Sequence, residues 1–150
     1  MKYYLAYGSN LNTAQMALRC PDARLFGVGY LDNYELIFHG SRGNAHASIR
    51  EKKGSKVPVA VWMISDQDER SLDCYEGFPR YYFKKDVDVV INGSAVTTMV
   101  YIMDEARGVN KPSPFYVDVI REGYSDMGMN PEYLDKALKK NKLEYEKAAS

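Results

Sequence analysis

The sequence has few of the side chains that build disulfide-bonded or metal-centred proteins. Its 150 residues include only two cysteines, Cys20 and Cys74, and two histidines, His39 and His46. They show neither the spacing of a disulfide framework nor that of a paired metal motif, and neither histidine has a neighbour that would complete a catalytic triad. The chain also lacks a Walker loop and a Gly-x-Gly-x-x-Gly turn. Metal, nucleotide and serine-hydrolase functions therefore have no support.

An excess of charge of one sign and long apolar runs are absent as well. Lys and Arg together number 20, as do Asp and Glu, and glutamates are interspersed among the lysines near the C-terminus. Without a basic block, we expect no nucleic-acid or anionic-membrane partner. No apolar run is long enough to cross a membrane, and the first residues do not resemble a signal peptide, so we expect a cytoplasmic protein. A length of 150 residues predicts a single domain, residues 1–150, and an apolar content of 45% is ordinary for a globular protein.

The turn at residues 7–11, Tyr-Gly-Ser-Asn-Leu, is the first feature that points to a function. An apolar run precedes it, and Asn12 and Gln15 follow with the spacing of a helix capping box. A glycine turn that enters a helix gathers backbone N–H groups without internal partners, and such a nest suits a carboxylate, a phosphate or an oxyanion. An ordinary strand-to-helix turn has the same residue types, so the turn alone leaves both interpretations open.

Hydrophobic patterning predicts several strands. They are expected at residues 2–7, 25–38, 47–49, 57–64, 81–91 and 95–103. Glycines within residues 25–38 predict two short strands with a bend or bulge between them. We expect residues 39–44 to form a loop at a pocket rim and residues 52–55 to form a turn. Asn92-Gly93 predicts a hairpin between the last two strands.

Capping residues and prolines place the helices between these strands. Helices are predicted from Thr13 until Pro21, from Ser65 until Gly77, from Ser113, and from Asn130. Several strands with few, scattered helices indicate an α+β fold. We expect a mixed, mostly antiparallel sheet that forms a small β-barrel with a few flanking helices.

Glu76 is the strongest candidate for a catalytic residue. It ends a predicted helix directly before Gly77, where the negative end of the helix dipole disfavours a carboxylate. Aromatic neighbours would also desolvate it, and both effects raise a carboxyl pKa toward the range useful for proton exchange near neutral pH. The alternative is an exposed residue at a helix end. Cys74 lies two residues earlier, so it should point away from Glu76 and serve as a small buried hydrophobe.

Four segments together resemble the gamma-glutamylcyclotransferase-like family. Residues 7–11 resemble its N-terminal signature, and residues 72–77, with Tyr81-Tyr82 after them, resemble its catalytic glutamate segment. Residues 47–62 follow the family's order, and residues 112–116 are similar to its later Pro-rich segment. The likeness spans about residues 3–134 and is specific because the motifs occur in order. Pro58, Val59 and the Phe78-Pro79-Arg80 loop depart from the family pattern, which leaves the identity of the substrate open.

The resemblance implies an enzyme, a lyase or transferase, that cyclises a gamma-glutamyl group to 5-oxoproline and releases an amine or amino acid. It implies that Glu76 acts as general acid and base and that no cofactor is needed. The implied substrate-binding residues are Tyr7, Gly8, Ser9, Asn10, Leu11, Tyr82 and Tyr116, with Arg80 as a further candidate for the pocket wall. The implied partner is a small gamma-glutamyl compound, as in glutathione metabolism. Two alternatives stay open: a non-catalytic domain that binds an amino-acid-like ligand, and the deprotection of a larger gamma-glutamylated metabolite.

Overall fold

The computed structural model describes residues 1–150, and the chain forms five strands and four α-helices joined by short connections. The strands are β1 (Lys2–Ala6), β2 (Arg24–Ser41), β3 (Asn44–Ile64), β4 (Tyr82–Ile91) and β5 (Ser94–Met103). The α-helices are α1 (Thr13–Arg19), α2 (Asp66–Glu76), α3 (Pro114–Asp126) and α4 (Glu132–Ala149). Two short 3-10 helices, η1 (Ser9–Leu11) and η2 (Glu105–Arg107), follow β1 and β5.

The five strands form one mixed sheet in the order β2-β3-β1-β5-β4. The central strand β1 is antiparallel to β3 and parallel to β5, while the remaining pairs are antiparallel. This arrangement confirms the predicted α+β class and the mixed, mostly antiparallel sheet. The sheet curves until Gly27 and Gly29 of β2 lie against Val90 and Ile91 of β4. The side chain of Ile91 fills the space beside Gly27, so the two edges face each other without a ladder and the barrel stays open.

The long β2–β3 hairpin differs from its prediction in two places. Its ladder runs to the pair Ser41–Asn44, so residues 39–44 are the tip of a hairpin rather than a loop between separate strands. Residues 52–55 do not end a strand either, because they stay within β3. The register shifts here, between Asp32 and Tyr34, and the side-chain oxygen of Asn33 accepts a hydrogen bond from the N–H of Gly54 at 3.1 Å. A bulge therefore absorbs the residues that the sequence pattern assigned to a turn.

The predicted starts of the first three helices and the second hairpin are confirmed, whereas α4 has Pro131 rather than Asn130 at its N-cap. Asn12 caps α1 by accepting from the N–H of Gln15, although the Gln15 side chain bonds to Arg19 and does not complete a capping box. Ser113 caps α3 in the same way, with Pro114 in its first turn. At the β4–β5 turn, Asn92 and Gly93 both have positive φ, 51° and 82°, as a two-residue hairpin requires.

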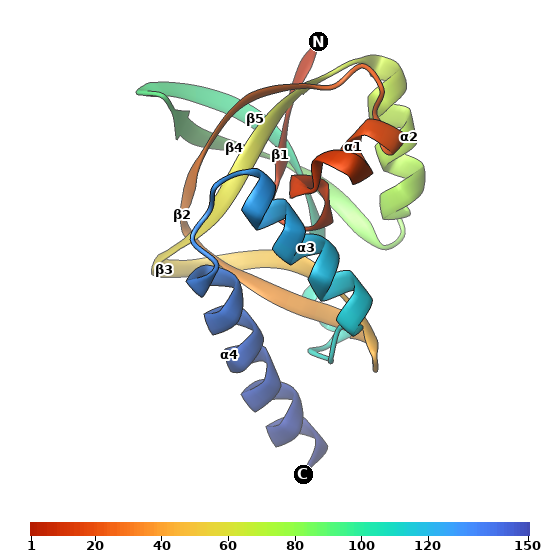
Figure 1. Ribbon diagram of the computed structural model, residues 1–150. Coiled ribbons are helices and arrows are strands. Elements are labelled where there is room, and N and C mark those ends of the chain that lie inside the picture. The colour runs from red at the N-terminus through yellow and green to blue at the C-terminus, as the bar shows by residue number, and fades with distance from the viewer.

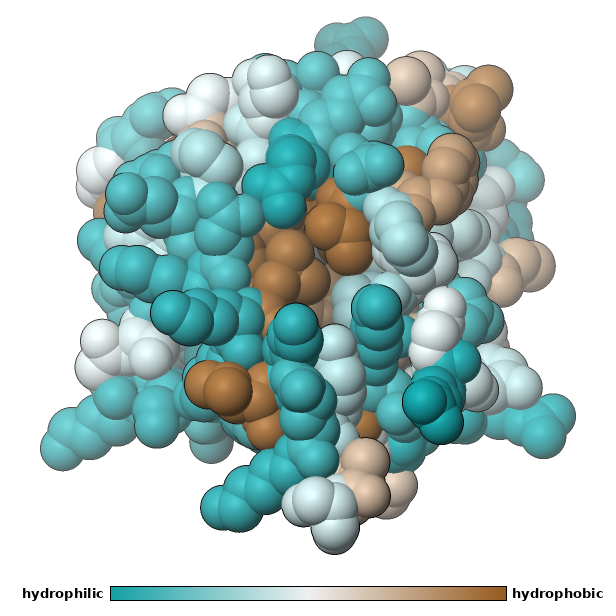
Figure 2. Space-filling view, turned by 60° about the horizontal axis from the view of Figure 1, so that its bottom comes forward, coloured by the Kyte–Doolittle hydropathy of each residue, from teal (hydrophilic) through white to brown (hydrophobic).

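Figure 1 shows how the helices lie around the sheet. Helix α3 crosses in front of the sheet, α1 and α2 lie together beside it, and α4 extends beyond it toward the C-terminus (Figure 1). On the face seen in Figure 2, hydrophobic side chains gather near the centre and hydrophilic ones surround them. None of the helices has the length and apolarity needed to span a membrane.

Candidate active site

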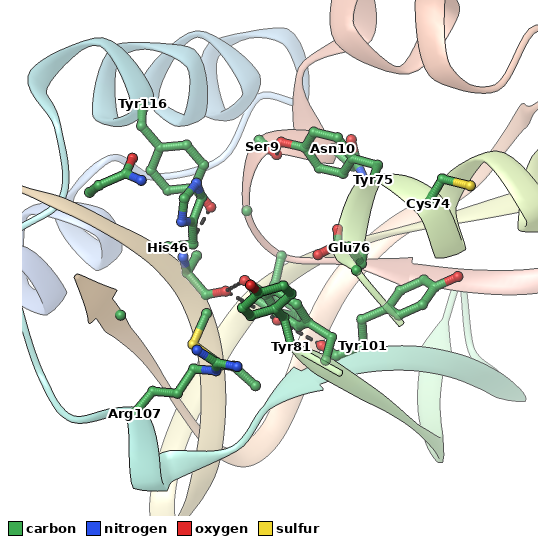
Figure 3. A pocket seen from close by; sticks show the side chains of 18 of the residues that line it. Ser9, Asn10, His46, Cys74, Tyr75, Glu76, Tyr81, Tyr101, Arg107 and Tyr116 are labelled. Atoms are coloured by element: carbon green, nitrogen blue, oxygen red, sulfur yellow. Dashed lines mark hydrogen bonds between the residues drawn. The ribbon is translucent and has the colours of Figure 1, made fainter. Parts of the chain in front are cut away.

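The main cavity of the protein has a volume of about 490 Å³ and lies where the turn after β1, the end of α2, the tip of the β2–β3 hairpin and the start of α3 meet. Seven of the eight site residues predicted from the sequence line it: Tyr7, Gly8, Ser9, Asn10, Glu76, Tyr82 and Tyr116. Leu11 does not, because its side chain is fully buried in the hydrophobic core. A cavity of this size suits a small molecule. Figure 3 shows residues from all four parts of the chain around one space.

The turn that lines the cavity at Gly8, Ser9 and Asn10 has backbone N–H groups without partners in the protein. The N–H of Leu11 donates to the carbonyl oxygen of Gly8 at 3.1 Å, closing η1, so Leu11 has no N–H free for a ligand. The N–H groups of Gly8, Ser9 and Asn10 take part in none of the turn, cap or side-chain hydrogen bonds. The predicted nest therefore consists of three residues, Gly8 to Asn10, rather than four.

The nest is held by contacts with α1 and α3. Arg19 donates hydrogen bonds to the side-chain oxygens of Asn10 and Ser9. The side-chain N–H of Asn12 donates to the carbonyl oxygen of Val119 at 3.0 Å. A β-carbon on Gly8 would lie only 3.1 Å from that of Ala47, so glycine permits the turn to approach the hairpin closely. These contacts fix the direction of the nest relative to the rest of the cavity.

Glu76 reaches the cavity because α2 ends at this residue. Gly77 follows it in the left-handed conformation, with φ of 63°, and the N–H of Phe78 donates back to the carbonyl oxygen of Asp73 at 2.9 Å. This is a Schellman termination, which glycine favours. A β-carbon at Gly77 would also lie 2.5 Å from the Tyr81 ring. The turn after α2 therefore requires glycine both for its backbone angles and for its packing against Tyr81.

The Glu76 carboxylate has no hydrogen-bond or ion-pair partner within the protein. Burial raises its pKa to about 7, and the nearby Arg19 guanidinium opposes that rise. Desolvation thus raises the pKa of Glu76, as the sequence predicted. Figure 3 shows the carboxylate near the middle of the cavity, whereas the Cys74 sulfur points away from it.

Three tyrosine hydroxyls from separate elements surround the backbone of Ala47. Tyr82 donates to the carbonyl oxygen of Ala47 at 2.8 Å, and Tyr7 donates to that of Tyr101 at 2.7 Å. Tyr116 is different, because its hydroxyl accepts from the N–H of Ala47 at 3.0 Å. Its own proton is therefore free for a ligand acceptor, while Tyr7 and Tyr82 offer their oxygens as acceptors.

Burial shifts the pKa values of the tyrosines, the histidine and the glutamate of the cavity, and the shifts differ in their effect on charge at neutral pH. Burial raises the pKa of Tyr7, Tyr82 and Tyr116 above that of a free phenol, so these hydroxyls stay protonated. Burial also lowers the pKa of His46, which keeps the imidazole neutral at neutral pH. Glu76 is the carboxyl group of the cavity, and its pKa of about 7 suits proton exchange near neutral pH.

The prediction that residues 39–44 would form part of a pocket rim is confirmed for Gly40, Ser41 and Asn44. His46, from β3, and Arg107, from η2, also line the cavity, and the sequence analysis assigned neither to it. Arg80 does not line the cavity.

The prediction that Cys74 is a small buried hydrophobe is wrong. Cys74 is exposed and lines the cavity. The inner face of α2 is occupied by Leu72, which is fully buried. Cys74 lies two residues further along the helix, about 200° around its axis, and so faces away from the core. Cys20, in contrast, is buried.

Comparison with known proteins agrees with the resemblance found in the sequence. Residues 4–119 match the model of a family described as gamma-glutamyl cyclotransferase, AIG2-like. The chain is 33% identical to the gamma-glutamylcyclotransferase of Homo sapiens over 142 residues, which cover 89% of this chain and 75% of the relative. It is 34% identical over 143 residues to the gamma-glutamylcyclotransferase of Bos taurus, with the same coverage, 89% and 75%.

Solved structures show the same fold. A crystal structure of a human protein described as uncharacterized has a TM-score of 0.81 and 32% identity, covering 91% of this chain and 85% of that one. A structure described as gamma-glutamyl cyclotransferase has a TM-score of 0.78 at 32% identity, with the same coverage, 91% and 85%.

Proposed function

This chain belongs to the gamma-glutamyl cyclotransferase, AIG2-like family, and we propose that it cyclises a gamma-glutamyl group to 5-oxoproline with release of an amine or amino acid. One observation carries the proposal. Glu76 has no partner in the protein, its pKa is raised to about 7, and it shares a cavity with the nest at Gly8 to Asn10. A proton acceptor beside an anion-binding turn is the combination that the reaction needs.

The reaction is an attack of the substrate's α-amine on the carbonyl carbon of its own side-chain amide. A C–N bond forms to close the five-membered ring, and the C–N bond to the leaving amine breaks. Glu76 takes a proton from the α-ammonium group, which frees the amine to attack, and passes that proton to the departing nitrogen as its C–N bond breaks. The second proton, which the new ring nitrogen sheds, ends on the released amine, which leaves as an ammonium ion, so Glu76 returns to its starting charge. Because nucleophile and electrophile belong to one molecule, binding in the ring-closing geometry removes much of the entropic barrier, and the reaction needs no cofactor.

The other predicted residues supply complementary binding groups. The N–H groups of Gly8, Ser9 and Asn10 hold the α-carboxylate or the developing oxyanion of the substrate. The free hydroxyl proton of Tyr116 donates to a second substrate oxygen, in keeping with its hydrogen bond from Ala47. The oxygens of Tyr7 and Tyr82 accept from the substrate's ammonium group. An oxyanion donor of this type contributes roughly 3–4 kcal/mol to catalysis.

The test is an assay of 5-oxoproline release by the purified protein across a panel of gamma-glutamyl amino acids, gamma-glutamyl amines and larger gamma-glutamylated metabolites. We expect release from at least one class. Compounds with the glutamyl group joined through its α-carboxyl are the matched control, since they cannot close the same ring. Saturable binding without release would instead identify a non-catalytic ligand-binding domain, and turnover of larger metabolites alone would identify a deprotecting enzyme.

A further inference from the structure

Tyr75, the residue before Glu76 in α2, makes contacts that the reaction described above does not use. It lines the main cavity and is 42% exposed. Its hydroxyl lies 3.2 Å from the hydroxyl of Ser9, within hydrogen-bond distance. Figure 3 shows the Tyr75 ring beside Ser9 and Asn10, with the Glu76 carboxylate below it in this view. Tyr75 therefore joins the end of α2 to the nest.

The ring of Tyr75 also stacks on the Arg19 guanidinium. The guanidinium carbon lies 3.5 Å from the ring centre, which is the shortest distance between a cation and an aromatic ring in the protein. Arg19 does not line the cavity, and it donates hydrogen bonds to the side-chain oxygens of Ser9, Asn10 and Gln15. It has no ion-pair partner. An unpaired cation is thus held between an aromatic face and the nest.

This cation acts on both parts of the candidate active site. Arg19 is the charged group that lowers the pKa of Glu76, and a positive charge next to the nest also attracts an anion bound there. The other titratable groups that act on or with Glu76 are hydroxyls that burial keeps protonated and therefore neutral, those of Tyr4, Tyr7, Tyr82 and Tyr116. The place of the Arg19 guanidinium therefore decides how much positive charge the site receives.

We propose that Tyr75 is a positioning residue, which keeps the Arg19 guanidinium against the nest and so holds the nest and Glu76 in the arrangement that cyclisation needs. The inference rests on the proposed function, because it concerns the two groups that this reaction uses. Without the ring, the long Arg19 side chain would regain rotamers in which its charge turns toward solvent. The stack needs the aromatic ring, whereas the contact with Ser9 needs the hydroxyl, so substitutions separate the two contributions.

The first measurement is 5-oxoproline release as a function of pH by the wild-type protein, Tyr75→Leu and Tyr75→Phe. Tyr75→Leu should raise KM by about 2- to 30-fold, the range for a cation–π contact. It should also move the rising limb of kcat/KM to higher pH, because the Arg19 charge no longer favours the ionised form of Glu76. Tyr75→Phe keeps the ring, so its limb should stay in place, and KM should rise by no more than about 10-fold, the loss of one hydrogen bond.

The second measurement is an NMR titration of the Glu76 carboxyl carbon in the same proteins without ligand. It needs no turnover, and it distinguishes a displaced charge from a general loss of stability. Tyr75→Leu should give a higher pKa for Glu76 than the wild-type protein, whereas Tyr75→Phe should give the wild-type value. Because Tyr75 is nearly half exposed, we expect both variants to fold, and their melting temperatures check this expectation.

Tyr30→Leu is the matched control variant. Tyr30 is 41% exposed and also carries a cation, the Lys56 ammonium at 4.3 Å from the ring centre, but it does not line the main cavity, so limb and titration should both keep their wild-type positions. An unchanged titration in Tyr75→Leu, or an equal shift in Tyr75→Phe, would overturn the inference while leaving the cyclisation intact. If the folded wild-type protein releases no 5-oxoproline, the proposed function fails, and the titration alone decides whether Tyr75 holds Arg19 in place.

Discussion

Glu69 and Glu76 lie seven residues apart on α2, which is almost two full helical turns and therefore nearly the same face, yet their surroundings are opposite. Glu69 accepts hydrogen bonds from Lys2 and Lys84, both at 2.8 Å. Burial favours its neutral form, but these two ammonium groups prevail and hold its pKa below the usual value. Glu76 has no such partner, and burial raises its pKa to about 7.

The difference shows what the cavity contributes. One end of the helix faces the ammonium groups that β1 and β4 supply, and the carboxylate there acts as a structural ion pair. The other end opens into a cavity lined by several tyrosines, where Arg19 is the charged group that acts on the carboxylate. A carboxylate left unpaired costs stability, and proteins keep such groups mostly at functional sites. The comparison therefore separates a carboxylate that stabilises the fold from one that is available for chemistry.

Glu76→Gln should produce the largest effect. The amide keeps the size of the side chain but cannot accept and return a proton, so we expect kcat to fall by roughly 10²- to 10⁴-fold or more. Substrate affinity should be retained or improve, because a negative charge near the substrate carboxylate is removed. Turnover, ligand affinity and melting temperature are measured on the same purified variant. Glu69→Gln is the matched control on the same helix and should keep its turnover; wild-type turnover by Glu76→Gln would exclude Glu76 from the mechanism.

The two carboxylates should affect stability in opposite directions as pH changes. The folded pKa of Glu76 lies above its unfolded value, so between about pH 4.5 and 7 the unfolded chain releases this proton first and stability falls as pH rises. Above pH 7 the full penalty is present, and Glu76→Gln should stabilise the fold by on the order of 2–3 kcal/mol.

For Glu69 the sign is reversed, because its folded pKa is depressed. Its contribution is present above its unfolded pKa of about 4.5 and is lost as pH falls through the folded value. Glu69→Gln should therefore destabilise the fold at pH 8 by about 1 kcal/mol and have less effect in acid. Urea unfolding of both variants at pH 8 and in acid measures the contrast. Destabilisation by both variants at pH 8 would identify Glu76 as a structural carboxylate as well.

Arg19 should have the smallest effect on the carboxylate itself, because it shifts the pKa of Glu76 without exchanging protons. Arg19→Met also removes the hydrogen bonds to Ser9 and Asn10, so the position of the pH profile is compared rather than the absolute rate. In the wild-type protein we expect kcat/KM to rise with pH through about 7, as Glu76 loses its proton. The Arg19 guanidinium favours the ionised form, so Arg19→Met should raise the pKa of Glu76 and move this limb of the profile to higher pH. The measurement is kcat/KM across the pH range, with Arg80→Met as the control whose limb stays in place. A shift toward lower pH would contradict the assignment.

The sequence alone determined the features that depend on neighbours within a few residues. Asn12, Ser65 and Ser113 were predictable as helix caps, because each bonds to a backbone N–H three residues ahead. Asn92-Gly93 required positive φ at both positions, and Gly77 marked the end of α2 at Glu76. The family resemblance rests on such local motifs in order, and it identified seven of the residues that line the cavity.

Only the tertiary structure decided which of these groups are free. The pairing of Glu69 with Lys84, the approach of Arg19 to Glu76, and the arrival of Arg107 at the cavity join residues far apart in the chain. The bulge at residues 52–55 and the hairpin tip at residues 39–44 likewise depend on the register between β2 and β3. Local sequence patterns do not reveal these contacts, because side-chain pairing and burial depend on segments that meet only after the sheet has formed. Whether a carboxylate is charged, and therefore which role it has, depends on the groups that the folded structure places around it.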